Sequence, residues 1–277
     1  MTEPTLTDLV ARALAEDIGT GDATTQSTVP AGASAHATIT QKQDGVLAGL
    51  STLREVLRQV APSVTLTLHV SDGDHNPAGT LVAELDGDAA EILLAERTAL
   101  NFLQHLSGIA TLTARYVAAV NGTQARILDT RKTTPGLRGL EKWAVTMGGG
   151  HNHRHGLYDM FMIKDNHIAV AGGITKAVEA IRPHLKQGIL IEVETTTLEE
   201  VAEALAAGAD IIMLDNMDNE TMAKAVALIG DRAKSEASGN MSAGRLAGVA
   251  LTGVDYISVG ALTHSVKALD ISQRIIN

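Results

Sequence analysis

The chain has 277 residues and a formal charge of -10, and 45% of its residues are hydrophobic although only 2% are aromatic. This length allows a large buried core, either in two domains or in one barrel with an appendage, and small aliphatic residues suit the interior of an α/β barrel. The lack of cysteine excludes disulfides, thiolate nucleophiles and cysteine metal sites, and the acidic balance argues against non-specific nucleic-acid binding.

The first part of the chain carries the patterns of a small α/β unit. Apolar residues at helical spacing predict helices over residues 5–16 and 51–60. Alternating apolar and polar residues predict strands over residues 35–41, 64–70 and 79–85. Short strands of this kind with turn signals between them favour a mostly antiparallel sheet.

A long helical region over residues 89–120 follows, and Gly108 predicts a break in it. We place the domain boundary at this point. Residues 1–108 are then the N-terminal domain and residues 109–264 the barrel domain. We also predict that residues 265–277 form a C-terminal helix that packs back on the first domain.

From residue 125 the pattern changes to short apolar strands that alternate with amphipathic helices, which is typical of a parallel sheet closed or nearly closed into a barrel. One of these helices follows a predicted capping box formed by Thr196 and Glu199. Because a closed barrel of this class has more strands than we count, an incomplete barrel is predicted. The six predicted strands cover residues 126–129, 160–163, 189–193, 210–214, 232–236 and 256–259.

Polar residues gather where these strands end, and in α/β barrels ligands bind at the C-terminal ends of the strands. Cationic residues dominate the early ends, and carboxylates the later ones. The first group fits carboxylates and a pyrophosphate. The second fits ribose hydroxyls, Mg²⁺ with its waters, or a positive charge that develops at a sugar carbon. The two groups are Thr130, Arg131, Lys132 and Lys164, and Glu194 and Asp215.

The last two strand ends carry glycine-containing turns, Ser238-Gly239-Asn240 and Gly260-Ala261, each before a predicted helix. Such turns present backbone N–H groups and a helix N-terminus to an anion. The last two loops of many barrels hold a phosphate. The sequence therefore predicts a phosphate site at these two turns.

Residues 129–167 reverse the acidic balance of the chain and hold four of its ten histidines. Such a group of cations is costly to desolvate unless an anion answers it, which indicates a small polyanionic ligand. The alternation His151-x-His153-x-His155 could instead form a metal site. The neighbouring cations argue against a metal there.

Other charged residues have a plainer interpretation. Arg138 and Lys142 are expected to be solvated on one helix face. Glu192 is expected to be a packing residue of the barrel interior, and His167 to cap or orient its own turn. Arg97, on the helix over residues 89–120, would be an ordinary surface residue by its sequence alone.

Several long motifs then resemble one family. They are Asp129-Thr-Arg-Lys-Thr-Thr-Pro-Gly136, Gly148-Gly-Gly-His-Asn-His-Arg154, Ile163-Lys-Asp-Asn-His167, Leu214-Asp-Asn216 and Val259-Gly-Ala-Leu-Thr263. These motifs resemble nicotinate-nucleotide pyrophosphorylase (carboxylating), the quinolinate phosphoribosyltransferase of NAD biosynthesis. The resemblance extends from about Leu9 to the C-terminal region, and Met241 stands where the family often has Ile or Leu.

This resemblance implies an N-terminal α/β sandwich followed by an open, incomplete, about seven-stranded α/β barrel. It implies a pentosyltransferase that transfers phosphoribosyl from phosphoribosyl pyrophosphate to quinolinate with decarboxylation. The products would be nicotinate mononucleotide, pyrophosphate and CO₂. The cofactor would be Mg²⁺. It also implies a homodimer, or a higher oligomer, with shared active sites, in which Arg97 reaches the barrel of the partner chain.

On this resemblance the cationic residues serve the two acids of the reaction. The quinolinate carboxylates would be held by Arg131, His153, Arg154 and Arg97 of the partner subunit. Lys132 and Lys164 would balance the pyrophosphate and part of the ring acid. Both lysines are therefore predicted to be catalytic.

The carboxylates and the turns would serve the sugar phosphate. Glu194 and Asp215, with Mg²⁺ nearby, would bind the ribose hydroxyls and stabilise an oxocarbenium-like state, which makes them catalytic. Thr130 completes the lining of this region. The 5′-phosphate would be held at Ser238, Gly239, Asn240, Gly260 and Ala261.

Three other functions compete with this one. A paralogous phosphoribosyltransferase-like protein linked to molybdate transport is disfavoured because Lys164 supplies charge for an anion. A metal-dependent amidohydrolase barrel would need further His and Asp ligands at the later strand ends. A phosphosugar-binding module would need neither the cationic set nor the paired carboxylates.

The chain also lacks the patterns of export and membrane insertion. Its first residues have neither the basic nor the apolar region of a signal peptide. No apolar run approaches the roughly 20 residues needed to span a bilayer. We therefore expect a cytoplasmic enzyme whose partners are small molecules and a second copy of itself, with no nucleic acid and no membrane.

Overall fold

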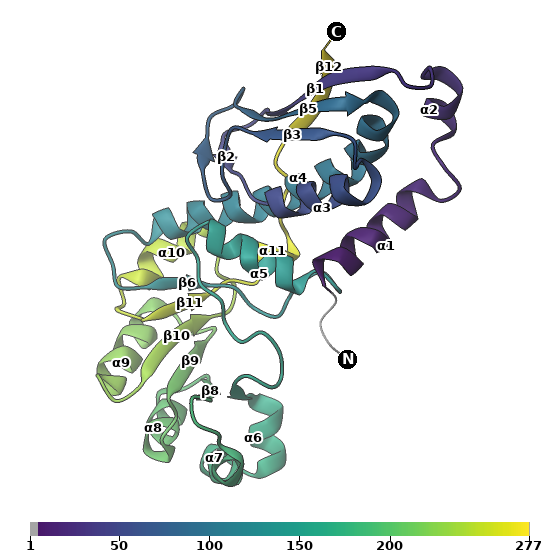
Figure 1. Ribbon diagram of the computed structural model, residues 1–277. Coiled ribbons are helices and arrows are strands. Elements are labelled where there is room, and N and C mark those ends of the chain that lie inside the picture. Colours follow the sequence, from purple (N-terminus) through teal and green to yellow (C-terminus); the bar gives the residue numbers. More distant parts are fainter. Residues whose placement is uncertain (1–4, 277) are drawn as a thin grey trace. The chain divides into compact units, whose positions relative to one another are not determined.

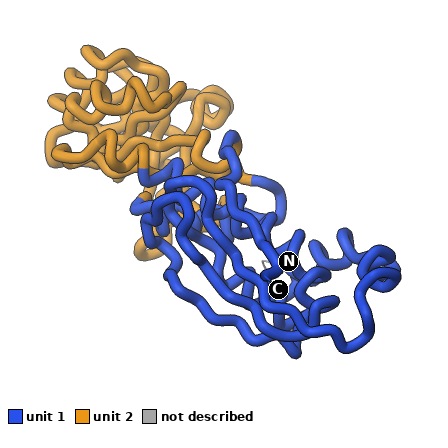
Figure 2. The backbone as a smooth tube through the Cα atoms, turned by 90° about the horizontal axis from the view of Figure 1, so that it is seen from above, with its two compact units in different colours: residues 1–114, 134–149, 265–277 blue, residues 115–133, 150–264 orange. Residues whose placement is uncertain are grey.

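The computed structural model describes residues 5–276, and the chain forms two compact units (Figure 2). Unit 1 comprises residues 1–114, 134–149 and 265–277, and unit 2 comprises residues 115–133 and 150–264. The predicted boundary at residue 108 falls inside helix α4 (Ala89–Ala119), which passes from unit 1 to unit 2 after Ala114. The segment 134–149 belongs to unit 1, although unit 2 surrounds it in sequence.

Unit 1 is built on a four-stranded antiparallel sheet with the strand order β12-β1-β5-β3 (Figure 1). Its strands are β1 (Ser34–Gln41), β3 (Thr65–Leu68), β5 (Leu81–Asp88) and β12 (Ile271–Ile276), and β2 (Gly45–Val46) pairs separately with β4 (His75–Asn76). Its helices are α1 (Leu6–Ile18), α2 (Ala23–Thr28), α3 (Leu50–Val60), most of α4, and α5 (Arg138–Met147). The strands and helices predicted before residue 89 are confirmed, with ends that differ by a few residues.

The core of unit 1 is formed by one face of this sheet and by α3 and α4. Ile39 from β1, Leu53 from α3 and Leu103 from α4 are fully buried in it. Alternate residues of β1 are buried near its end, which is the period-2 pattern of a strand with one covered face. Burying each of these large side chains stabilises the fold by about 1.5–3 kcal/mol.

The C-terminal segment is a strand, so the predicted helix over residues 265–277 is wrong for the residues that the structure describes. Ile271–Ile276 form β12, which pairs antiparallel with β1 and places Gln273 opposite Ile39. Gln104 of α4 fixes the approach to this strand: its carbonyl accepts from the Leu269 N–H at 2.9 Å, and its Nε2 donates to the Ile271 carbonyl at 2.6 Å. The sequence alone could not show that β1 offers an open edge.

Helix α4 is unbroken, so the predicted break at Gly108 is also wrong. A Cβ atom at Gly108 would overlap the backbone carbonyl oxygen of Lys267. The neighbouring Ser107 accepts a hydrogen bond from the Ala48 N–H at 2.9 Å through its Oγ. The glycine therefore lets another segment of unit 1 approach the helix closely, and it does not end the helix.

Replacing Gly108 by alanine should destabilise the protein, by about 1–3 kcal/mol because of overpacking. In an ordinary helix interior the same change would stabilise it, by about 1 kcal/mol, so the sign of the effect is diagnostic. Urea unfolding followed by circular dichroism measures it. Gly244→Ala in α10 (Ala243–Ala250) is the matched control, because a Cβ atom there meets nothing within 4 Å. Equal stability changes in the two variants would contradict the close approach at Gly108.

Helix α5 is buried more deeply than its charges suggest. The prediction that Lys142 is solvated is wrong, since the side chain is 1% exposed, and Arg138 is half-buried. The adjacent Glu141 is fully buried, lies 2.8 Å from Nε2 of His105 and accepts from the Thr134 N–H at 3.0 Å. Charged residues of α5 therefore belong to the interior of unit 1.

Unit 2 holds a sheet of six parallel strands in the order β6-β11-β10-β9-β8-β7. Figure 1 shows this order from β6 to β8. The strands are β6 (Arg126–Leu128), β7 (Phe161–Ile163), β8 (Ile191–Thr195), β9 (Ile211–Asp215), β10 (Lys234–Ser238) and β11 (Tyr256–Ser258). The helices between them are α6 (Asp165–Ala171), α7 (Ile174–Ile181), α8 (Leu198–Ala207), α9 (Asn219–Ile229), α10 and α11 (Ala261–His264), and a 3-10 turn spans Arg182–His184. All six predicted parallel strands are confirmed.

The sheet of unit 2 is open. Its end strands are β6 and β7, and no pairing joins them within residues 5–276. Next to β6, His151 forms a single parallel bridge to Leu128. This isolated bridge is the one feature of the described chain that corresponds to a seventh strand. Helix α8 begins one residue later than predicted, because the capping box consists of Thr197 and Glu200 and not of Thr196 and Glu199.

Candidate active site

A cavity of about 1020 Å³ lies in unit 2 at the C-terminal ends of the parallel strands. Side chains two residues apart on a strand face the same side, so each strand supplies a deeper and a shallower residue. The pairs that line the cavity are Met162 and Lys164, Met213 and Asp215, Glu236 and Ser238, and Ser258 and Gly260. The sheet therefore sets the depth of each functional group in the cavity.

The residues of unit 2 that the sequence predicts to bind substrate or to act in catalysis all line this one cavity. They are Thr130, Arg131, Lys132, His153, Arg154, Lys164, Glu194, Asp215, Ser238, Gly239, Asn240, Gly260 and Ala261. Arg97 lies apart from them in sequence, on α4, and is exposed. Its role toward a partner chain stays a prediction.

The loop after β6 carries the first cations of the cavity. The Lys132 N–H donates to Oγ1 of Thr130 at 3.1 Å, and the Lys132 carbonyl accepts from Oγ1 of Thr263 at 2.7 Å. A Cβ atom on Gly260 would lie 2.9 Å from Cδ of Lys132, so the glycine leaves room for this side chain. The loop is thus held from two sides, with Lys132 directed over the turn after β11.

Arg154 is the most buried cation of the cavity, with 8% of its surface exposed. Burial and the nearby positive charge of Arg131 lower its pKa from the usual value. An anion bound between or beside two such guanidinium groups would offset their mutual repulsion. Planar guanidinium groups bind a carboxylate through two parallel hydrogen bonds, which makes a carboxylate a fitting anion.

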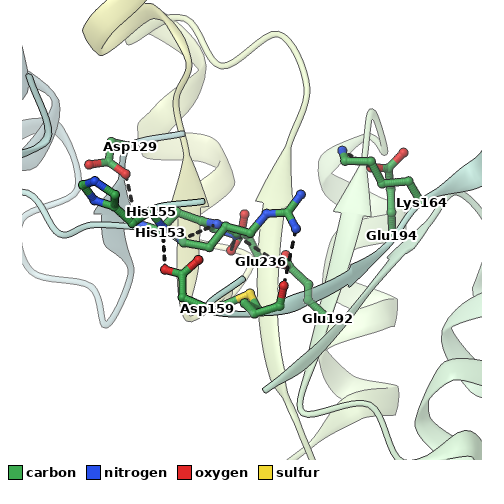
Figure 3. A network of polar contacts seen from close by, with 10 residues as sticks. Asp129, His153, His155, Asp159, Lys164, Glu192, Glu194 and Glu236 are labelled. Atoms are coloured by element: carbon green, nitrogen blue, oxygen red, sulfur yellow. Dashed lines mark hydrogen bonds and ion pairs between the residues drawn. The ribbon is translucent and has the colours of Figure 1, made fainter. Parts of the chain in front are cut away.

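The segment that carries Arg154 is held by two acids, the buried Asp129 and the half-buried Asp159. The fully buried Asp129 accepts from the His153 N–H at 2.9 Å (Figure 3). Asp159 accepts from the N–H groups of His155 and Gly156 at 2.6 and 3.0 Å. Burial alone would raise the pKa of Asp159, but these backbone hydrogen bonds outweigh it and lower the pKa. The turn around Arg154 therefore has little freedom.

On the opposite wall, Lys164 and Glu194 form an ion pair (Figure 3). Nζ of Lys164 lies 2.9 Å from Oε2 of Glu194, and the carboxylate side chain is 15% exposed. The Lys164 N–H donates to Nδ1 of His167 at 3.0 Å, which confirms that His167 orients its own turn. Nearby, Oδ2 of Asp215 accepts from Nδ2 of Asn216 at 2.7 Å. A lysine and two acids thus share this wall.

Three buried ionisable side chains, His153, Glu192 and Glu236, lie together, and of these His153 and Glu236 line the cavity. Nε2 of His153 lies 2.9 Å from Oε2 of Glu192 and 3.5 Å from Oε2 of Glu236 (Figure 3). Both glutamates are fully buried, and none of their four oxygens has a well-aligned hydrogen bond. The sequence predicts Glu192 to be a packing residue of the barrel interior, and its patterns assign no role to Glu236. Its signal was its position two residues before Ser238 on the same strand.

The three groups shift one another's proton affinity. Burial lowers the pKa of His153, but the two carboxylates outweigh burial and raise it to about 10. Burial and the charge of Glu236 raise the pKa of Glu192 to about 7. The Arg154 N–H donates to Nδ1 of His153 at 2.8 Å, so that nitrogen carries no hydrogen in this geometry. The proton affinities of these buried groups are therefore coupled to one another.

These three residues are also the one group of potential metal ligands that lies together within residues 5–276. Of the triplet His151, His153 and His155, only His153 belongs to it. The alternative of a metal held by three alternating histidines therefore has no geometric support in the described chain.

The turn after β10 is held in an uncommon backbone conformation. Asn216 and Asn240 have φ values of 54° and 50° and are the two non-glycine residues in the left-handed region among those described. Nδ2 of Asn240 donates to Oδ1 of Asn216 at 3.3 Å, and Arg245 donates to the carbonyls of Gly239 and Met217. Asn216 and Arg245 therefore brace this turn, a role that the sequence patterns do not predict.

The same turn leads into α10, whose first residue follows Ser242. The Ser242 side chain makes no capping hydrogen bond, so the N–H groups of the first turn keep their capacity for an anion. This turn and the turn at Gly260 border the same cavity. The arrangement suits a phosphate at the rim, while carboxylates would be bound near the two guanidinium groups.

Comparison with known proteins identifies the family. The family model for the quinolinate phosphoribosyl transferase C-terminal domain matches residues 109–274, and that for the N-terminal domain matches residues 22–107. The chain belongs to the quinolinate phosphoribosyl transferase family. The resemblance drawn from the motifs and the predicted α/β fold class are thereby confirmed.

Individual relatives agree along nearly the whole chain. A probable nicotinate-nucleotide pyrophosphorylase (carboxylating) of Bacillus subtilis (strain 168) is 48% identical over 260 residues, covering 94% of this chain and 90% of that protein. A chloroplastic nicotinate-nucleotide pyrophosphorylase (carboxylating) of Arabidopsis thaliana is 47% identical over 282 residues, covering 95% and 80%. The solved structure of the nicotinate-nucleotide pyrophosphorylase from Francisella tularensis has a TM-score of 0.95 at 42% identity, covering 98% of this chain and 96% of that one.

The sequence predicts that no segment of the chain spans a membrane, and the lengths and hydropathy of the helices bear on this prediction. No helix within residues 5–276 of this family member is long and apolar enough to cross a bilayer. Residues 1–4, on which the expectation of no signal peptide partly rests, lie outside the described residues.

Proposed function

We propose that this protein transfers the phosphoribosyl group of phosphoribosyl pyrophosphate to the ring nitrogen of quinolinate. The products are nicotinate mononucleotide, pyrophosphate and CO₂, as in de novo NAD biosynthesis. The observation that supports this most is the division of one cavity by charge. Two guanidinium groups, Arg131 and Arg154, belong to it together with two acids, Glu194 and Asp215, and phosphate-type turns.

Quinolinate is a flat pyridine ring with carboxylates on two adjacent carbons, one of which is next to the ring nitrogen. Arg131 and Arg154 bind these carboxylates, and each guanidinium can grip one of them through two hydrogen bonds. Bidentate contacts fix the plane of the ring as well as its place. They therefore aim the nitrogen lone pair at the sugar carbon, which is the positioning that a bimolecular reaction requires.

At the other side of the cavity the sugar carbon becomes positive as its bond to pyrophosphate breaks. Glu194 and Asp215 hold the ribose hydroxyls and stabilise this oxocarbenium-like charge. Lys132 and Lys164 balance the negative charge that accumulates on the departing pyrophosphate. The nitrogen lone pair then forms the new bond to the sugar carbon, and the ring nitrogen becomes positive.

Loss of CO₂ follows from that positive charge. The electron pair of the bond to the adjacent carboxylate stays on the ring carbon, next to the positive nitrogen that stabilises it. This carbon then takes a proton from the surrounding water or from an acidic group of the site. The protein contributes mainly orientation to this step and needs no strong general base.

Mg²⁺ fits the acid wall of the cavity. The carboxylates of Glu194 and Asp215 both line the cavity and are partly exposed, and carboxylate oxygens with waters are the usual ligands of this ion. These two residues would hold it. When bound, Mg²⁺ supplies positive charge to the pyrophosphate.

The active unit would be a homodimer in the cytoplasm. Arg97 is exposed on α4 and would add a further guanidinium to the quinolinate site of the partner chain. The family resemblance and the acidic, cysteine-free composition support this proposal. Sedimentation measures whether the protein is a dimer. If the active site is shared, the Arg97→Ala variant should lose activity and still sediment as a dimer.

The proposed reaction is tested by mixing the purified protein with quinolinate, phosphoribosyl pyrophosphate and Mg²⁺. Nicotinate mononucleotide and CO₂ labelled from the 2-carboxylate should appear in equal amounts. Nicotinate, which lacks that carboxylate, is the control substrate and should release no CO₂. Cleavage of phosphoribosyl pyrophosphate without a nucleotide product would contradict the proposal.

A further inference from the structure

The buried acids Glu192 and Glu236 have no part in the reaction described above. Glu192 does not line the cavity, and both side chains are fully buried. Burying carboxylates without good hydrogen bonds is costly, so a fold that retains two of them needs a compensating role. The basic side chain that both acids face is His153.

His153 connects these acids to a residue of the quinolinate site. Its Nε2 faces the carboxylates at 2.9 and 3.5 Å, and its Nδ1 accepts from the Arg154 N–H at 2.8 Å. The ring thus meets the acids on one side and the backbone of Arg154 on the other. Since this contact occupies Nδ1 and the acids face Nε2, the ring serves better as a spacer than as a ligand for quinolinate.

We propose that Glu192 and Glu236 are positioning residues for Arg154, acting through His153. The two carboxylates fix the ring by Nε2, and the ring fixes the Arg154 backbone by Nδ1, so that the guanidinium stays directed at one quinolinate carboxylate. This role rests on the proposed function. It revises the predicted role of His153, which becomes a support for Arg154.

The strand geometry explains why two acids are needed. Glu192 lies on β8 and Glu236 on β10, with β9 between them. Acids from two strands approach the imidazole from two directions, so the ring can neither turn nor tilt without losing one contact. Glu192 also acts on Arg154 directly: burial and Arg131 lower the pKa of Arg154, and the charge of Glu192 raises it. Quinolinate then meets a cation that is already held.

The test compares Glu192→Gln and Glu236→Gln with the unaltered protein. Glutamine keeps the shape of the side chain and removes its charge. Each change should raise both the Kd and the KM for quinolinate by about tenfold or more, since a charge-assisted contact is lost, while the KM for phosphoribosyl pyrophosphate changes by less than about twofold. Calorimetry with quinolinate alone gives the Kd, and steady-state kinetics give both KM values.

Two further variants sharpen the comparison. Glu220→Gln removes an acid from an exposed face of α9 and should leave both KM values unchanged. His153→Asn keeps an acceptor near the place of Nδ1 but loses the contact with the acids, and should weaken quinolinate binding like the glutamine variants. It therefore tests the proposal even if a glutamine variant fails to fold.

Three results would overturn this role. The first is quinolinate binding in the variants that equals that of the unaltered protein. The second is an equal rise in both KM values, which indicates a general structural defect. The third is a stoichiometric metal in the purified protein that Glu192→Gln removes, because the three residues would then be ligands. Failure of the unaltered protein to bind quinolinate would refute the proposed function itself, and this role with it.

Discussion

Replacement of Arg131 by alanine should lower kcat/KM for quinolinate by about 100- to 1,000-fold, which corresponds to about 3 to 4 kcal/mol for truncating one partner of a desolvated, hydrogen-bonded charge pair. The side chain is half-buried on the cavity wall, close enough to Arg154 for the two charges to interact. Its removal leaves one quinolinate carboxylate without a guanidinium. The KM for phosphoribosyl pyrophosphate should change far less.

Steady-state kinetics with each substrate varied in turn would measure this effect, and circular dichroism would show whether the fold is intact. Arg58→Ala is the matched control, because Arg58 is an exposed arginine of unit 1 that pairs with Glu55 on its own helix. Such surface pairs contribute little. Near-normal turnover by the Arg131 variant would refute its assignment to quinolinate.

Replacement of Gly239 by alanine should raise the KM for phosphoribosyl pyrophosphate by about tenfold or more. Gly239 has a φ of 91°, and a Cβ atom there would overlap Oδ1 of Asn216. The left-handed conformation costs an L-residue about 1–2 kcal/mol, and the overlap adds to it. The turn must then move, and its N–H groups no longer point at the 5′-phosphate.

The control for this variant is Gly244→Ala, five positions further on in α10, where an added Cβ atom has open space. That variant should keep its KM and be slightly more stable, since alanine is favoured in helices. Quinolinate binding without phosphoribosyl pyrophosphate should be unaffected in both variants. An unchanged KM in the Gly239 variant would show that the phosphate is held elsewhere.

Local patterns were sufficient for most elements of the fold. Helix α9 and its end at Gly230, the strands of unit 2 and the strands of unit 1 before α4 all carry their own periodicity and turn residues. The rule that parallel strands place their ends at one edge then selected the cavity residues, including Lys164 and Asp215. Each of these features depends on residues close together in sequence.

The incorrect predictions concern residues whose contacts lie far away in sequence. The residues around Gly108 predict a helix break there. In the structure the glycine instead makes room for the backbone of Lys267, a residue near the other end of the chain. The residues of β12 need the open edge of β1, and Lys142 looks like a surface residue until the packing of α5 is known. Glu236 becomes visible only when β8 and β10 are placed on either side of β9. Long-range contacts decide these positions.

The position of β12 in the chain has a consequence for folding during synthesis on the ribosome. Because β12 follows all of unit 2 in the chain and completes the sheet of unit 1, the ribosome must translate the whole barrel before that sheet can close. Until then, β1 presents a free edge that other strands can pair with. The nascent chain therefore finishes its later unit before its earlier one, and early release or truncation would leave an aggregation-prone intermediate in which only the barrel is complete.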